Sequence, residues 1–186
     1  MKAASASGRG FTLIETVVAV ALLAVLFIFV LPNVDRLSPK YALRAAAREI
    51  GSTVDLCRSN AVSDAKTYAI RYELDRGTYS VFGPPSDEPD EPLGEPGPFG
   101  TYQIGGPRRL PSGVRIVAVK PDVTQTVSGG EMAVRFSPLG YEGSHVVVLE
   151  NEKGERLSLK YNAMIGLTDY REGEVEFRRV GTGSGQ

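Results

Sequence analysis

The most apolar stretch of the chain lies near its amino terminus. It covers residues 11–31 and is interrupted only by Thr12, Glu15 and Thr16. At ~1.5 Å rise per residue, a helix of this length covers roughly 31 Å, close to the ~30 Å hydrocarbon thickness of a bilayer. The pattern therefore predicts a transmembrane helix over residues 11–31.

A second helical pattern follows Pro32. Because proline removes a backbone donor and clashes with the preceding turn, Pro32 predicts a helix kink. Small and apolar residues then recur at spacings of mostly three and four: Leu43, Ala46, Ala47, Ile50, Val54, Cys57, Ala61 and Ala65. One apolar face at this period is typical of an amphipathic helix. We expect a single stem helix over about residues 11–65, with its second half (32–65) packed on a globular head.

After Asp64 the pattern changes to a period of two, which indicates strands. A hairpin is predicted around the turn Asp75-Arg76-Gly77. The predicted strands are 67–74, 78–82, 114–120, 132–136, 145–150, 156–161 and 175–180. Residues 66–186 are thus expected to form an antiparallel β head, and with the long helix the fold class is α+β.

Residues 83–111 interrupt the strand pattern with eight prolines, six glycines and five acidic residues. Such a composition buries little apolar surface, so the segment is predicted to be a mobile surface loop. Single acids separated by prolines make a poor calcium site, because that ion needs six to eight converging oxygens.

The composition of the chain excludes several kinds of functional site. Lys plus Arg (21) nearly balances Asp plus Glu (22), so there is no overall basic field to attract nucleic acid. The single cysteine, Cys57, excludes an internal disulfide, and the single histidine, His145, excludes a multi-histidine metal site. We interpret Cys57 as a buried hydrophobe and His145 as a strand residue beside Val146. No catalytic constellation is recognisable, so we expect neither an enzyme nor a bound cofactor or metal.

The amino terminus carries a targeting signal. Residues 1–10 hold two basic residues, Lys2 and Arg9, and no acid, which predicts a cytoplasmic start and an exported remainder. The apolar run is longer than the core of a secretory signal peptide and no small-x-small cleavage site follows it, so an uncleaved signal anchor fits better. Glu15 is costly inside such a run. Either it reaches the lipid head groups, or it has a function that requires a partner.

The sequence Arg9-Gly10-Phe11-Thr12-Leu13-Ile14-Glu15 resembles the type III signal of type IV pilins and type II secretion pseudopilins. The resemblance implies that a prepilin peptidase cuts between Gly10 and Phe11. Residues 1–10 would then be a leader, and Phe11 would become N-methylated. It also implies that Glu15 acts in assembly, pairing with the new amine of a neighbouring subunit in a medium of low dielectric.

Later motifs are similar to those of the H-type, GspH/FimT-like group of this family. They are the runs 45–50 (AAAREI), 56–61 (LCRSNA) and 136–140 (FSPLG). This resemblance implies a minor pseudopilin of a type II protein secretion system, anchored in the bacterial inner membrane with a periplasmic head. Such a subunit helps to initiate or cap a pseudopilus, and its stem helix contacts other pseudopilins or pilins.

Two alternatives remain open. The first is a FimT-like minor type IV pilin in pilus assembly or DNA uptake, in which Arg178 and Arg179 would contact nucleic acid. We expect Glu172, Glu174 and Glu176 to offset that charge, which makes nucleic acid a less favoured partner. The second is a single-pass anchored periplasmic binding domain that retains its leader and tolerates Glu15→Ala.

Overall fold

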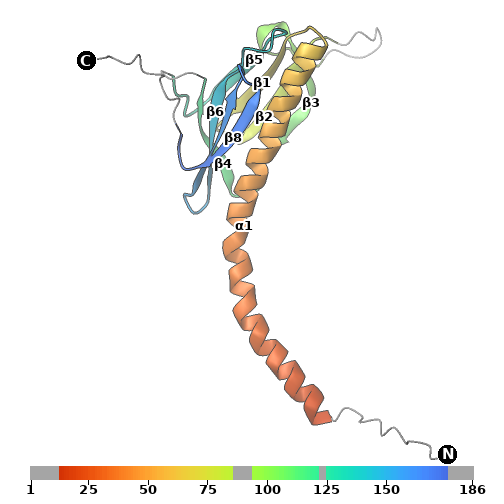
Figure 1. Ribbon diagram of the computed structural model, residues 1–186, viewed down its shortest axis with the longest axis vertical. Coiled ribbons are helices and arrows are strands. Elements are labelled where there is room, and N and C mark those ends of the chain that lie inside the picture. Colours follow the sequence, from red (N-terminus) through yellow and green to blue (C-terminus); the bar gives the residue numbers. More distant parts are fainter. Residues whose placement is uncertain (1–12, 86–93, 122–124, 176–186) are drawn as a thin grey trace, which may run out of the picture. The chain divides into compact units, whose positions relative to one another are not determined.

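The computed structural model describes residues 13–85, 94–121 and 125–175, with the backbone alone over residues 24–38. The chain divides into two compact units, Met1–Ser38 and Pro39–Gln186. We call the second unit the head. Figure 1 shows the elements, and each unit is described by itself.

Within the described residues the stem helix α1 spans Leu13–Ser63, which confirms one long helix with a carboxyl end close to the predicted one near residue 65. Its backbone remains helical through Pro32, and the predicted kink there stays a prediction. The helix ends where Ala65 adopts a left-handed backbone conformation (φ 53°). The Tyr68 hydroxyl then donates a hydrogen bond to Asp64 Oδ2 at 2.6 Å, which fixes the turn from helix to strand.

The described residues of the head form two four-stranded antiparallel sheets. Sheet A has the order β3-β2-β1-β5, from β1 (Tyr68–Glu73), β2 (Thr78–Gly83), β3 (Tyr102–Arg109) and β5 (Glu131–Phe136). Sheet B has the order β4-β6-β7-β8, from β4 (Val114–Lys120), β6 (His145–Asn151), β7 (Arg156–Asn162) and β8 (Leu167–Glu172). A short 3₁₀ helix, η1 (Pro98–Gly100), precedes β3. The predicted α+β class is confirmed.

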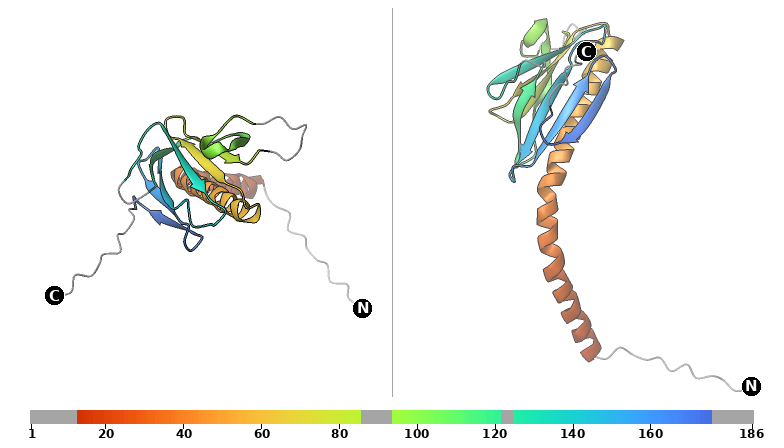
Figure 2. Two further views of the ribbon diagram at one scale, coloured as in Figure 1. Left: turned by 90° about the horizontal axis from the view of Figure 1, so that it is seen from above. Right: turned by 60° about the vertical axis from the view of Figure 1, so that its left-hand side comes forward.

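The second half of α1 lies along both sheets (Figures 1 and 2). The predicted apolar stripe is buried from Leu43 to Ala61, whereas Ala65 is exposed. The stripe joins side chains of both sheets in one core, among them Ile70 and Tyr79 of sheet A and Leu149 and Leu159 of sheet B. The head is therefore built around the helix, because neither sheet could bury its inner face without it.

The sequence was wrong about part of the 83–111 segment. β3 occupies residues 102–109 and pairs with β2, so a predicted loop contains an edge strand. An edge strand tolerates Pro107 because one of its sides needs no backbone donors. Its ladder hydrogen bonds also stabilise it without apolar burial. Residues 86–93 of the same segment lie outside the described residues.

A second difference concerns the end of the head. β8 was not predicted, because five of its six residues are exposed and the strand shows no regular alternation of apolar and polar positions. Of the strand predicted at 175–180, only Val175 is described, and it lies outside any strand. Residues 176–180 lie outside the described part of the chain.

Candidate assembly site

The amino-terminal turns of α1 form an exposed apolar surface. Every side chain from Leu13 to Leu23 is exposed in this chain, with fractions such as 85 % for Leu13 and 71 % for Ile14. Glu15 lies within this surface and in the first turn of the helix, where a negative charge is favoured by the helix dipole. Exposed apolar surface of this extent marks a site that lipid or protein covers.

Several predicted site residues fall beyond what the structure describes. Gly10 and Phe11 lie outside the described residues, as do Arg178 and Arg179, and of Pro32 only the backbone is described. Within the described parts of the chain, no helix has an apolar stretch long enough to cross a membrane. The predicted segment 11–31 includes residues 11–12 and the side chains of 24–31, which are outside that description.

Polar contacts attach the second half of α1 to sheet A. The Tyr79 hydroxyl donates to Glu49 Oε1 at 2.9 Å, and the Arg108 guanidinium donates to Thr53 Oγ1 at 3.2 Å. Burial is the main cause that raises the pKa of Tyr79 above its ordinary value. The phenol therefore stays protonated and keeps its role as a donor at neutral pH.

Sheet B holds the other side of the helix through its edge strand β8. Thr168 Oγ1 donates to Asp55 Oδ1 at 3.0 Å. Glu172 Oε1 accepts a hydrogen bond from Arg44 at 2.8 Å and lies 3.3 Å from Lys40 Nζ. The bonds from Arg44 and then Lys40 lower the pKa of Glu172. Acidic and hydroxyl groups of β8 and α1 thus hold the strand against the helix, with Glu172 facing the basic residues Lys40 and Arg44.

One buried hydrogen bond joins the two sheets directly. His145 on β6 and Tyr72 on β1 are both fully buried, and the Tyr72 hydroxyl lies 2.9 Å from His145 Nε2. His145 Nδ1 lies 2.6 Å from the Gly143 carbonyl oxygen, which can only accept, so Nδ1 carries the proton and Nε2 accepts from Tyr72. Burial lowers the pKa of His145 to about 4. His145 is a strand residue as predicted, and both of its ring nitrogens are engaged in structural bonds.

An ion-pair network covers the face of sheet B that points away from the helix. Glu150 on β6 accepts from Arg115 and, at 2.7 Å, from Arg156. Glu174 accepts from Lys120 Nζ and from Arg156, each at 2.7 Å. Hydrogen bonds from Arg156 and then Arg115 lower the pKa of Glu150, and those from Lys120 lower the pKa of Glu174. The segment that follows β8 is thereby fixed to the sheet.

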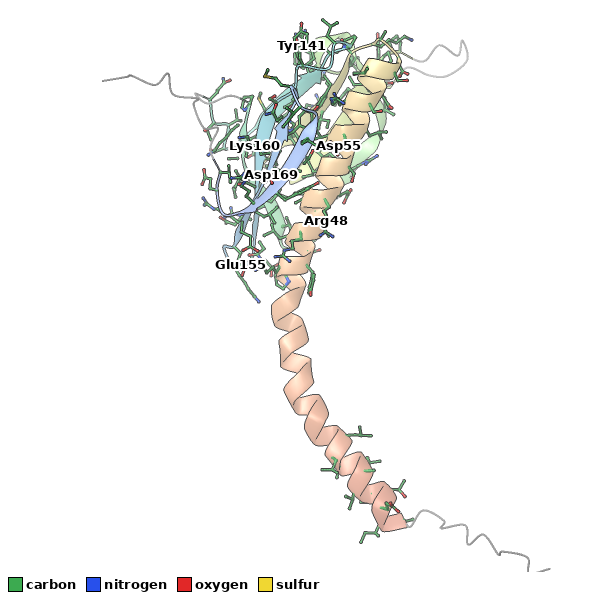
Figure 3. All side chains as sticks on the ribbon, in the orientation of Figure 1. Arg48, Asp55, Tyr141, Glu155, Lys160 and Asp169 are labelled. Atoms are coloured by element: carbon green, nitrogen blue, oxygen red, sulfur yellow. The ribbon has the colours of Figure 1, made fainter. Side chains whose placement is uncertain are left out.

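A second exposed apolar surface lies at the end of the head where α1 ends. Its turns pack against the helix, since Gly140 adjoins Val62 and Gly166 adjoins Arg58. We define this distal patch by its large exposed side chains: Val62, Leu139, Tyr141, Met164, Ile165 and Leu167. Figure 3 shows Tyr141 at this end and Glu155 at the opposite one. The run 136–140 singled out in the sequence supplies Leu139, and its Gly140 has φ +74°.

The described residues offer little for catalysis. Cys57 is buried on the apolar stripe, and burial raises the pKa of its thiol to about 12, so it is not a reactive thiolate at neutral pH. Among the described residues, no group of three or more metal-binding side chains is placed to hold a metal ion. The interpretation of Cys57 as a buried hydrophobe is in accord with its burial.

Comparisons with known proteins agree with this arrangement. A family model for the prokaryotic N-terminal methylation motif matches residues 6–31. No curated protein sequence matches the chain.

Two solved structures have a similar fold, and both are of the minor pseudopilin EpsH from the type II secretion system of Vibrio cholerae. One has 11 % identity and a TM-score of 0.54 over 74 % of this chain and 99 % of that one. The other has 9 % identity and a TM-score of 0.50 over 70 % and 96 %. At these identities the likeness concerns the fold. The chain therefore joins a match to the N-terminal methylation motif, over residues 6–31, to a head whose fold is similar to that of a minor pseudopilin.

Proposed function

We propose that this chain is a minor pseudopilin of a type II protein secretion system. In this proposal it is a structural subunit, not an enzyme, and it helps to initiate or cap a short periplasmic filament. Prepilin peptidase cuts between Gly10 and Phe11, and Phe11 is then N-methylated. Residues 11–31 anchor the subunit in the bacterial inner membrane, with its head in the periplasm.

The observation that carries the proposal is the methylation motif leading directly into an exposed apolar helix. The motif match covers residues 6–31, and the described side chains of α1 within it, Leu13 to Leu23, are all exposed. Exposing such a surface to water costs roughly 25 cal/mol of free energy for each Å² of apolar area. Lipid before assembly and neighbouring stem helices afterwards would each cover it.

The head supports the same role. Its fold resembles that of EpsH, and the polar contacts described above attach the sheets to α1 and to each other. The distal patch gives the head a second apolar surface for a neighbouring subunit. A subunit between others in a filament needs contacts at both the stem and the head.

One observation keeps the FimT-like alternative open. Glu172 and Glu174, expected to offset the charge of Arg178 and Arg179, already bind basic residues of the head. Nucleic-acid binding by the full chain that weakens with salt, and that is lost when both arginines are replaced by glutamine, would favour a DNA-uptake pilin. Equal binding before and after that replacement would exclude these two arginines as the contact.

The deciding experiment is the intact mass and amino-terminal sequence of the protein, purified from membranes with and without prepilin peptidase. We expect a start at N-methylated Phe11 only when the peptidase is present. An unprocessed chain in both membranes would contradict the proposal and favour the anchored binding domain. A second experiment would then distinguish a type II secretion system from a type IV pilus. The pilus genes and the secretion genes are deleted in turn, and the deletion that releases the processed chain from its complex identifies the system to which it belongs.

A further inference from the structure

The distal patch contains one basic side chain, Arg58 of α1. Its guanidinium lies where the turn after β5 and the turn after β7 meet the helix. A methyl group placed on Gly166 would lie 2.9 Å from Arg58 Cζ, and one placed on Gly140 would lie 3.9 Å from Arg58 Nη2. Because neither glycine has a side chain, the guanidinium packs against the backbone of both turns.

The exposed apolar residues of the patch belong to the same two turns. Each glycine lies between two of them in the sequence: Leu139 and Tyr141 around Gly140, and Ile165 and Leu167 around Gly166. The guanidinium of Arg58 is therefore set among exposed apolar side chains, a place where a charge loses its hydration as soon as another surface covers the patch.

Arg58 has donors that the head does not use. Within the described parts of the chain it makes no hydrogen bond and no ion pair. Of its three side-chain nitrogens only Nε is buried, and this atom has no hydrogen-bond partner. The two terminal nitrogens are thus open to solvent, and an acceptor from outside can reach them while the head keeps its conformation.

The acids around the patch do not supply the missing partner. Those nearest to its residues in the sequence are bound elsewhere on the head: Asp55 to Thr168, Asp64 to Tyr68, Glu142 to Arg135 and Asp169 to Arg171. If the patch were covered by a purely apolar surface, Arg58 would be buried without a counter-charge, which is strongly unfavourable.

The interior beneath Arg58 offers no negative charge either. Tyr161 is fully buried, and its hydroxyl oxygen has no hydrogen-bond partner. Burial raises the pKa of Tyr161, although the nearby charge of Arg58 acts in the opposite direction, so the phenol stays protonated. Ser137, at the start of the turn that contains Gly140, also has a buried hydroxyl without a partner. The counter-charge for Arg58 therefore has to come from another molecule.

We propose that the distal patch binds an apolar surface of a neighbouring subunit that carries a carboxylate at its centre. The two terminal nitrogens of Arg58 bind the carboxylate, and the exposed side chains of the two turns cover the apolar residues around it. A paired guanidinium keeps its counter-charge when water is excluded. That the partner is a subunit of the same filament rests on the proposed function, whereas the need for an acid among apolar side chains does not.

The test uses the full chain in lipid nanodiscs and the probe peptide acetyl-Gly-Leu-Val-Glu-Leu-Val-Gly-amide. The chain has no tryptophan, so Tyr141→Trp places a single fluorescent reporter on the patch. A comparison probe replaces the glutamate by glutamine. We expect the glutamate probe to bind at least roughly tenfold more tightly than the glutamine probe, because a charged hydrogen bond contributes more than a neutral one.

Matched variants, all carrying Tyr141→Trp, separate the charge from the apolar contact. Arg58→Gln should abolish the preference for the glutamate probe, and Arg58→Lys should retain part of it because a point charge lacks the two-pronged geometry. Arg48→Gln is the control, since Arg48 is an exposed arginine of α1 outside the patch, and it should keep the preference (Figure 3). Leu139→Ser should weaken both probes by the same factor.

The wild-type preference and the Leu139 variant test the site even if Arg58→Gln unfolds, because Leu139 is 73 % exposed. Equal binding of the two probes, a preference that survives Arg58→Gln, or unchanged binding by Leu139→Ser would each overturn the proposal. Probe binding does not depend on prepilin peptidase. A negative result here would therefore leave the amino-terminal processing untouched, and the two proposals can fail separately.

Discussion

The hydrogen bond between Tyr72 and His145 makes the head sensitive to pH at one residue. His145 is fully buried and neutral, with a pKa near 4 in the folded chain against 6.5 when exposed. Between these values the unfolded chain binds a proton that the folded chain does not. The contribution of His145 to stability is therefore complete above about pH 6.5 and is lost progressively as the pH falls toward 4.

We expect the unfolding free energy to drop by about 2 kcal/mol between pH 7 and pH 5 from this residue, at 1.36 kcal/mol per unit. Urea unfolding of the full chain in micelles measures it. Glu150, Glu172 and Glu174 have lowered pKa values and remain charged over this range, so they add little. The control is His145→Phe, which keeps a ring but cannot titrate and should give a flatter profile. An equally steep profile would contradict the assignment.

For single residues, the sequence predicted burial and secondary structure better than it predicted side-chain contacts. Cys57 was placed on a buried stripe and His145 on a strand, since both follow from local periodicity. Their contacts did not follow. Tyr72 and His145 are separated by 73 positions, and their meeting depends on how sheet A and sheet B pack. The same holds for Arg71 on β1, whose guanidinium lies over the ring of Phe82 on β2, a contact that depends on the pairing of the two strands.

Among the elements, α1 and β8 meet at Gly51, where the Tyr170 side chain lies against the helix. A methyl group placed there would lie 2.1 Å from Tyr170 Oη and 3.3 Å from Leu159 Cδ1. Glycine normally costs about 1 kcal/mol relative to alanine inside a helix. Its presence is explained by the Tyr170 side chain, whose hydroxyl lies over Gly51 and would have to move to admit a methyl group.

We expect Gly51→Ala to lower the unfolding free energy by about 1 kcal/mol net, because overpacking costs typically 1–3 kcal/mol and exceeds the gain in helix propensity. In a Tyr170→Ala background the same substitution should become neutral or stabilising, and a double-mutant cycle in urea measures that coupling. Ser52→Ala, at the adjacent exposed position, is the control and should change little. Equal effects of Gly51→Ala in both backgrounds would show that Tyr170 is not the obstacle.

The elements that the sequence predicted are those with a regular apolar period. The stem helix and the five strands β1, β2, β4, β6 and β7 follow from it, as does most of β5. β3 and β8 did not, because both are edge strands with mainly exposed side chains. Their stability comes from ladder hydrogen bonds and from polar contacts such as Thr168 with Asp55, which composition does not reveal.

For the molecule as a whole, the decisive sequence signal was the run from Arg9 to Glu15. It predicted a pilin-like chain, and the methylation-motif match and the fold of the head agree with it. The cleavage, the methylation and the role of Glu15 stay predictions. The proposed anchor adds a physical requirement: a carboxylate among apolar side chains needs a positive partner when lipid or protein covers it.

We expect Glu15→Ala to be processed normally but to enter filaments at least roughly tenfold less than the wild type, since loss of one buried partner leaves the other charge uncompensated. The readout is the amount of chain in sheared or cross-linked filaments, measured together with its intact mass. Glu15→Asp should retain much of the assembly, and Val18→Ala, an exposed neighbour on α1, should assemble like the wild type. Full assembly of Glu15→Ala after normal processing would contradict this prediction. The amine of Phe11 would then have another counter-charge, and apolar packing alone would set how neighbouring stem helices align along the filament.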